Sequence, residues 1–107
     1  MALPGLTKEQ MVEVDRIMVE DYNIPLELMM ENAGLALARI AARYLDSVEK
    51  SIGIVVGSGN NGGGGLVAAR RLHNWGFDVH VIIPKGIDAF KPVPRIQWQR
   101  AFAVGFF

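Results

Sequence analysis

The fold of this 107-residue chain is decided by two adjoining stretches, Ser51-Ile52-Gly53-Ile54-Val55-Val56-Gly57 and Gly57-Ser58-Gly59-Asn60-Asn61-Gly62-Gly63-Gly64-Gly65. The first is short, rich in β-branched residues and bounded by turn residues, which predicts a buried strand. The second predicts a glycine-rich loop, after which a helix begins at Leu66 and stops at Gly76. A second strand is predicted over Asp78–Ile83, closed by Pro84. Such a strand–loop–helix–strand unit needs a right-handed crossover and a parallel pair of strands.

Two helices are predicted upstream of this unit. Thr7-Lys8-Glu9-Gln10 has the form of a capping box, and apolar residues then recur at helical spacing, which predicts a helix over about 8–21. Pro25 suits the first turn of a second helix. That helix carries one apolar stripe, which predicts helix packing: Leu26, Met30, Ala33, Leu37, Ile40 and Tyr44.

Beyond the second strand the pattern weakens. Pro92 and Pro94 interrupt it, a short helix is predicted over 95–103, and residues 104–107 have the composition of a third strand at its start. A two-stranded parallel sheet leaves its edges exposed and cannot cover both of its faces. We therefore expect residues 1–107 to form a single, truncated α/β domain, a fragment of a parallel sheet preceded by two N-terminal helices.

Composition limits the function. Half of the residues are apolar, and 11 basic residues balance 11 acidic ones, which argues against nucleic-acid or anionic-membrane binding through bulk charge. The absence of cysteine excludes disulfides, thiolate metal ligands and a cysteine nucleophile. No apolar run approaches the length of a membrane-spanning helix, and the N-terminus lacks the pattern of a secretory signal, so we expect a cytoplasmic protein.

The glycine-rich loop carries the strongest chemical signal. Glycines permit positive φ and let a ligand approach the backbone, and the amides at the following helix N-terminus favour a phosphate. The side-chain oxygens of Asn60 and Asn61 can coordinate a hard cation or accept a hydrogen bond from an amide. A flexible glycine turn that binds no ligand is the alternative interpretation.

Gly57-x-Gly59-x-x-Gly62 satisfies the dinucleotide-binding pattern of Rossmann folds in its strand-to-helix context. The acidic residue expected at the end of the second strand is missing, because Pro84 and Lys85 stand there. This argues against ordinary ribose recognition by a dehydrogenase. A Walker-type phosphate loop is excluded, because no Lys-Ser/Thr pair follows Gly62.

The whole loop, continued through Leu66-Val67-Ala68-Ala69-Arg70, resembles the signature of the NAD(P)H-hydrate epimerase family, also called the YjeF N-terminal domain. Upstream, Ile24-Pro25-Leu26-Glu27-Leu28-Met29-Met30-Glu31-Asn32-Ala33-Gly34 resembles the second helix of that family. Downstream, the segment from Gly76 to Lys85 resembles its next strand. The resemblance runs over residues 7 to about 86 and corresponds to the N-terminal part of a family domain of roughly twice this length.

The resemblance implies a Rossmann-like, usually dimeric protein that interconverts the R and S epimers of NADHX and NADPHX, the hydrated forms of the reduced nicotinamide cofactors. It implies partnership with an NAD(P)H-hydrate dehydratase. By position, it assigns one residue, Asn61, as a potassium ligand and another, Lys85, as a lysine that assists catalysis. The nucleotide-hydrate binding loop that it implies consists of Asn60, Asn61, Gly62, Gly63 and Gly64.

One departure lies inside the motif, since Gly64 stands where the family has an aspartate. The family's later potassium-binding and acid/base aspartates also lie beyond the resembling segment. Two alternatives to an epimerase therefore stay open: a nucleotide-binding module without catalysis, and an interaction scaffold that has kept the fold.

Six other residues invite a functional interpretation and are assigned structural roles. His73 and His80 have no partner at metal-ligand spacing, so we expect both to be structural. Arg70 and Arg71 are expected on a solvated helix face, with phosphate contact as the alternative, and Trp75 and Trp98 are expected to be packing residues.

Overall fold

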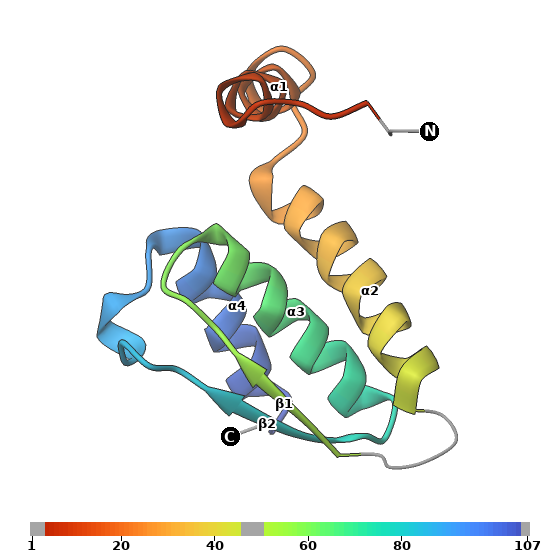
Figure 1. The fold of residues 1–107 in the computed structure, drawn as a ribbon. Helices are drawn as coiled ribbons and strands as arrows, with labels where there is room; N and C mark the ends of the chain where they lie inside the picture. The colour runs from red at the N-terminus through yellow and green to blue at the C-terminus, as the bar shows by residue number, and fades with distance from the viewer. Residues whose placement is uncertain (1–3, 46–50, 106–107) are drawn as a thin grey trace.

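A computed structural model describes residues 4–45 and 51–105. In chain order the elements are α1 (Lys8–Glu20), α2 (Leu26–Leu45), β1 (Ser51–Val55), α3 (Asn60–Asn74), β2 (Asp78–Ile82), the 3₁₀ turn η1 (Ile87–Ala89) and α4 (Pro92–Ala103). Figure 1 shows α2, α3 and α4 beside one another along the sheet, while α1 stands apart beyond the start of α2. The α/β, Rossmann-like class with two leading helices is confirmed.

The two strands pair in parallel, from Ser51 opposite Asp78 to Val55 opposite Ile82. Their exposure alternates, because α3 covers only the face that carries Ile52, Ile54 and Val79. On the other face Val55 is 67% exposed. The prediction of a parallel pair is confirmed, whereas the prediction that the first strand is buried holds for one face only.

Helix α1 begins where the local sequence predicts it. Thr7 Oγ1 accepts from the amide of Gln10 at 3.1 Å, and Gln10 Oε1 accepts from the amide of Thr7 at 2.8 Å, which completes the predicted capping box. None of its residues is buried. Helix α1 therefore depends on its capping box more than on a core.

Helix α3 begins earlier than predicted. Residues 60–65, expected to be part of a loop, form its first turns. Glycine is a poor helix former, so local propensity argues against this start. Tertiary packing overrides this local preference, because Gly62 and Gly63 are buried where an added Cβ would clash, and Gly65 is buried close against Val56. At its other end α3 stops as predicted, with Gly76 at φ +95°.

The predicted apolar stripe of α2 is partly wrong. Leu37 and Ile40 are about half exposed and Tyr44 is 81% exposed. The buried residues are instead Met30, Gly34 and Ala38, spaced four apart. The small residues at 34 and 38 let α2 approach α3 closely, and that approach, rather than hydrophobicity alone, selects the buried face.

Two predictions for the C-terminal segment also change. Helix α4 starts at Pro92, not near residue 95, because a proline in the first helical turn leaves no required hydrogen bond unmade. Residues 104 and 105 form a turn rather than the start of a strand, and residues 106–107 lie outside the described residues. No helix within the described ranges is long and apolar enough to cross a membrane.

Candidate functional site

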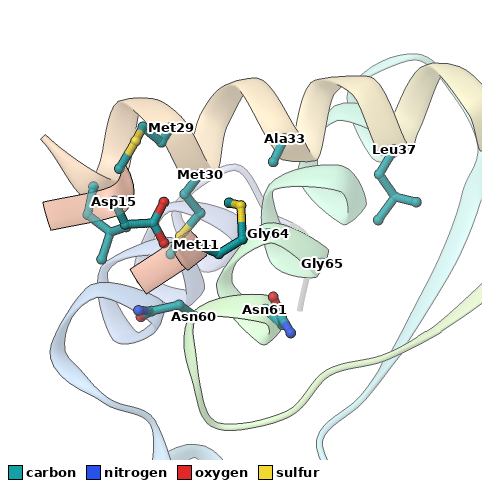
Figure 2. A pocket seen from close by; sticks show the side chains of 11 residues that line it. Met11, Asp15, Met29, Met30, Ala33, Leu37, Asn60, Asn61, Gly64 and Gly65 are labelled. Atoms are coloured by element: carbon teal, nitrogen blue, oxygen red, sulfur yellow. The ribbon is translucent and has the colours of Figure 1, made fainter. Parts of the chain in front are cut away.

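A cavity of about 550 Å³ lies between α1, α2 and the first turns of α3. This volume falls in the range of small-molecule and cofactor sites. Figure 2 shows side chains from all three helices directed into it. The lining residues are Met11, Asp15, Leu26, Met29, Met30, Ala33, Leu37, Asn60, Asn61, Gly64 and Gly65. The cavity therefore combines a wall of methionine and leucine with the polar start of α3.

The structure divides the predicted binding loop into two groups. Asn60, Asn61 and Gly64 line the cavity, and both asparagines are exposed. The side of Gly64 on which a Cβ would stand is open space. Gly62 and Gly63 are buried and do not line the cavity. Three of the five predicted loop residues thus share one surface.

The glycines of the loop act differently from what the sequence predicts. All described glycines with positive φ lie elsewhere, at positions 76, 86 and 105. A Cβ on Gly62 would stand 1.8 Å from the carbonyl oxygen of Gly57, and one on Gly63 would stand 2.5 Å from Sδ of Met30. These two glycines allow close packing of the protein against itself.

Lys85 lies on an exposed turn that follows β2. Because β1 and β2 are parallel, this turn and the loop after β1 lie at the same end of the sheet. Lys85 is not among the residues that line the cavity. The structure therefore places it at the predicted end of the sheet and outside the cavity.

Arg70 and Arg71 are not on a solvated face. Both guanidinium groups pair with the carboxylate of Glu31, Arg71 through Nε at 2.9 Å and Nη2 at 2.5 Å, and Arg70 through Nη2. Burial works to raise the pKa of Glu31, but the hydrogen bonds from both arginines outweigh it and hold the pKa below its usual value. The cluster joins α2 to α3.

We expect Glu31→Gln to destabilise the chain by about 1–3 kcal/mol at pH 7, because it leaves two partly buried guanidinium groups without their counterion. A carboxylate with a lowered folded pKa stabilises the fold above its unfolded pKa, and this stabilisation is lost as the pH falls through the folded value. The stability advantage of the wild type should therefore shrink as the pH falls below the unfolded-state pKa of a glutamate, about 4.3. Urea unfolding at pH 7 and pH 3.5 measures it.

The control for that prediction is Glu13→Gln, which removes an ion pair with Arg16 that lies within α1. Surface pairs of this kind contribute little, so the urea midpoint should not move. Equal midpoints for Glu31→Gln and the wild type at pH 7 would contradict the assignment of Glu31 as the link between α2 and α3.

The two histidines lie on different elements, His73 on α3 and His80 on β2. His80 Nε2 lies 3.2 Å from Asp78 on an exposed strand face, so His80 has a carboxylate neighbour that the sequence analysis did not anticipate. No group of three or more His, Cys, Asp or Glu side chains able to hold a metal exists among residues 4–45 and 51–105.

The two tryptophans were both predicted to be packing residues. Trp98 packs against Phe102 with ring centroids 5.4 Å apart, whereas Trp75 is 44% exposed.

Sequence reasoning missed the helical wall of the cavity. Met11 and Asp15 come from α1, and Met29 from α2. The i, i+4 spacing of Met11 and Asp15 puts them on one face of α1, which was a detectable signal. Nothing local indicated that this face would lie opposite the start of α3.

Residues 26–106 match the family described as YjeF-related protein N-terminus. This chain belongs to that family. The matched segment includes α2, the two strands, α3 and α4, and it contains the loop residues that line the cavity.

Curated relatives carry related names. The chain is 38% identical over 92 residues to the bifunctional NAD(P)H-hydrate repair enzyme Nnr of Thermofilum pendens, covering 86% of this chain and 17% of that protein. It is 32% identical over 114 residues to the NAD(P)H-hydrate epimerase of Aedes aegypti, covering 87% of this chain and 49% of that protein. The chain thus spans less than half of the length of these relatives.

A solved structure has the same architecture. The crystal structure of yeast ynu0 matches with a TM-score of 0.80 at 27% sequence identity, over 97% of this chain and 44% of that one. Helix α1, which lies outside the family match, is thus included almost entirely in the structural match.

Proposed function

We propose that this chain carries the binding half of an NAD(P)H-hydrate epimerase, which interconverts the R and S epimers of NADHX and NADPHX. The observation that carries the proposal is the cavity at the start of α3, which Asn60, Asn61 and Gly64 share. The names of the curated relatives support the same reaction.

The cavity suits a pyridine nucleotide in two respects. Its methionine and leucine wall offers an apolar surface to a nicotinamide ring, and thioethers adapt well to such rings. The first amides of α3 have no partner within the helix, and the helix dipole favours negative charge there. The ring is therefore proposed against α1 and α2, and the phosphates nearer to the start of α3.

Potassium is proposed as the cofactor, with Asn61 as one ligand. The amide oxygens of Asn60 and Asn61 at one cavity are the hard oxygen donors that such a cation prefers, so the donor chemistry fits. The cation supplies positive charge that orients the nucleotide when it is bound. Asn61 and its neighbours in the described chain provide only part of a full coordination shell.

Lys85 is proposed to assist catalysis. Epimerisation at the hydrated ring carbon needs loss and return of hydroxide, or ring opening, with a proton delivered to the departing oxygen. Lys85 can donate such a proton from the turn after β2, at the carboxyl end of the strands, where open α/β sheets bind ligands. A ligand that extends from the cavity to this turn would connect the two.

The test of the proposed function follows one epimer. Purified chain is mixed with the S epimer of NADPHX, and the R to S ratio is followed by chromatography, with and without potassium. We expect the mixture to reach its equilibrium ratio faster than without protein, and faster still with potassium. An unchanged rate in both conditions contradicts catalysis by this chain.

A second candidate is a nucleotide-binding module without catalysis. Gly64 favours it, because the cavity lacks the carboxylate that the family motif places at this position. Calorimetry separates the two: binding of NADPHX without conversion selects the module, and absence of binding selects an interaction scaffold.

Two partners belong to the same proposal. A homodimer is supported by the exposed apolar side chains Val12 and Val14 of α1, which do not line the cavity. A dehydratase partner is supported by relatives whose names describe bifunctional repair enzymes. The cytoplasmic location expected from the composition is part of this proposal as well.

A further inference from the structure

We propose that Asp15 of α1 is a ligand-binding residue, whose carboxylate accepts a hydrogen bond from the hydrated nicotinamide half of the nucleotide. This inference rests on the proposed function and adds a contact from a helix that lies outside the family match. It begins with the composition of the cavity, in which Asp15 is the only ionisable side chain among the lining residues.

The carboxylate is placed to meet a ligand. Figure 2 shows Asp15 directed into the cavity, beside Met11 and Met30 and on the side where Asn60 lies. Asp15 therefore faces the start of α3 across the space that a bound molecule would fill. It joins the apolar wall and the asparagine pair into one surface.

The carboxylate of Asp15 is not occupied by a hydrogen bond or ion pair with another described residue. Three other acidic residues near it in sequence, Glu13, Glu20 and Asp21, lie within 4 Å of Arg16. Asp15 makes no hydrogen bond or ion pair with any residue in the described ranges. All of its acceptor capacity remains for water or a ligand.

The chemistry of a carboxylate limits what it binds. An ionised carboxylate accepts hydrogen bonds and repels phosphate, so Asp15 selects hydroxyl or amide donors and disfavours the anionic part of a nucleotide. The nicotinamide half of NADPHX has such donors in its carboxamide, its ring hydroxyl and its ribose. The apolar neighbours of Asp15 suit the ring of that same half.

Gly64 lines the same cavity as Asp15, and a side chain at position 64 would meet open space. Among the residues that line the cavity, the carboxylate is therefore on α1, at Asp15, and position 64 on α3 has no side chain although there is space for one. A carboxylate supplied from position 64 should replace one lost from position 15, which offers a rescue experiment that a purely structural role for Asp15 would not explain.

The experiment is calorimetry on the full chain with NADPHX and, separately, with AMP, which lacks the nicotinamide half. We compare the wild type with Asp15→Asn, with the double variant Asp15→Asn/Gly64→Asp, and with Glu9→Gln as the matched control on α1. We expect Asp15→Asn to raise the Kd for NADPHX about tenfold or more, since hydrogen bonds to charged groups are strong. The Kd for AMP should not change, Glu9→Gln should match the wild type, and the double variant should regain most of the affinity.

Each other outcome overturns the inference in a recognisable way. An unchanged or lower Kd for Asp15→Asn shows that the carboxylate makes no favourable contact. Equal weakening toward NADPHX and AMP, or no regain in the double variant, shows an effect other than recognition of the nicotinamide half. Absence of NADPHX binding by the wild type overturns the proposed function along with the inference, and thus differs from every result in which only Asp15 fails. Circular dichroism confirms that each variant is folded.

Discussion

Gly62→Ala should largely unfold the chain. The added Cβ would stand 1.8 Å from the carbonyl oxygen of Gly57 and 2.7 Å from its carbonyl carbon, and both atoms belong to the backbone. The clash can be relieved only by moving the loop after β1 or the start of α3. Overpacking typically costs about 1–3 kcal/mol, and because this clash is with backbone at a buried site we expect a larger loss, about 4 kcal/mol or more, which is a large part of the stability of a small domain.

Thermal unfolding followed by circular dichroism measures this loss, and Gly64→Ala is its matched control. Position 64 lies in the same turns of α3, but an added Cβ there meets nothing within 4 Å. Alanine is the better helix former, so Gly64→Ala should stabilise the chain by about 0.5–1 kcal/mol. A Gly62→Ala variant as stable as the wild type would mean that the turn after β1 is not closed as the structure has it.

Gly62 and Gly64 differ in whether an added side chain would clash, and the sequence alone could not predict this difference. Four consecutive glycines indicate a place where side chains are disfavoured. They do not indicate why a side chain is disfavoured at each position. Gly62 contacts its own loop, Gly63 contacts Met30, and Gly64 faces the cavity. These distinctions depend on partners from β1 and α2, which no local pattern specifies.

Predictions that depend on neighbours in sequence succeeded. The capping box at Thr7 and the end of α3 at Gly76 are local events, and both occur as expected. The parallel strand pair follows from a short chain connection and its helix. These features specify the α/β class without knowledge of the packing.

Only some of the residues that line the cavity could be predicted, because the others depend on packing between elements that are distant in sequence. Asn60 and Asn61 follow from their place between a strand and a helix, whereas Asp15 comes from a helix about 45 residues earlier. Its carboxylate acquires a role only when α1 is placed opposite α3. When a site is built from several helices and strands, a single sequence predicts only those of its residues that belong to one recognisable motif.

The second large effect is expected at the contact between α2 and α3. A Cβ added to Gly34 would stand 2.4 Å from Cβ and Cγ1 of Val67 and 2.9 Å from the carbonyl oxygen of Gly64. Gly34→Ala should therefore push the two helices apart and destabilise the chain by about 1–3 kcal/mol, even though alanine favours a helix. Because α2 forms a wall of the cavity, the same change should weaken NADPHX binding.

The companion variant Val67→Ala tests whether the backbone or the side chain sets this contact. Val67→Ala removes Cγ1 and keeps Cβ, so one short contact of Gly34→Ala is relieved while those with Cβ of residue 67 and with the carbonyl of Gly64 persist. The double variant should thus regain only a minor part of the lost stability in a double-mutant cycle measured by urea unfolding. Full recovery would show that α2 and α3 are held at their distance by one methyl group. Partial recovery would show that Cβ of residue 67 and the carbonyl oxygen of Gly64 also limit how closely α2 approaches α3.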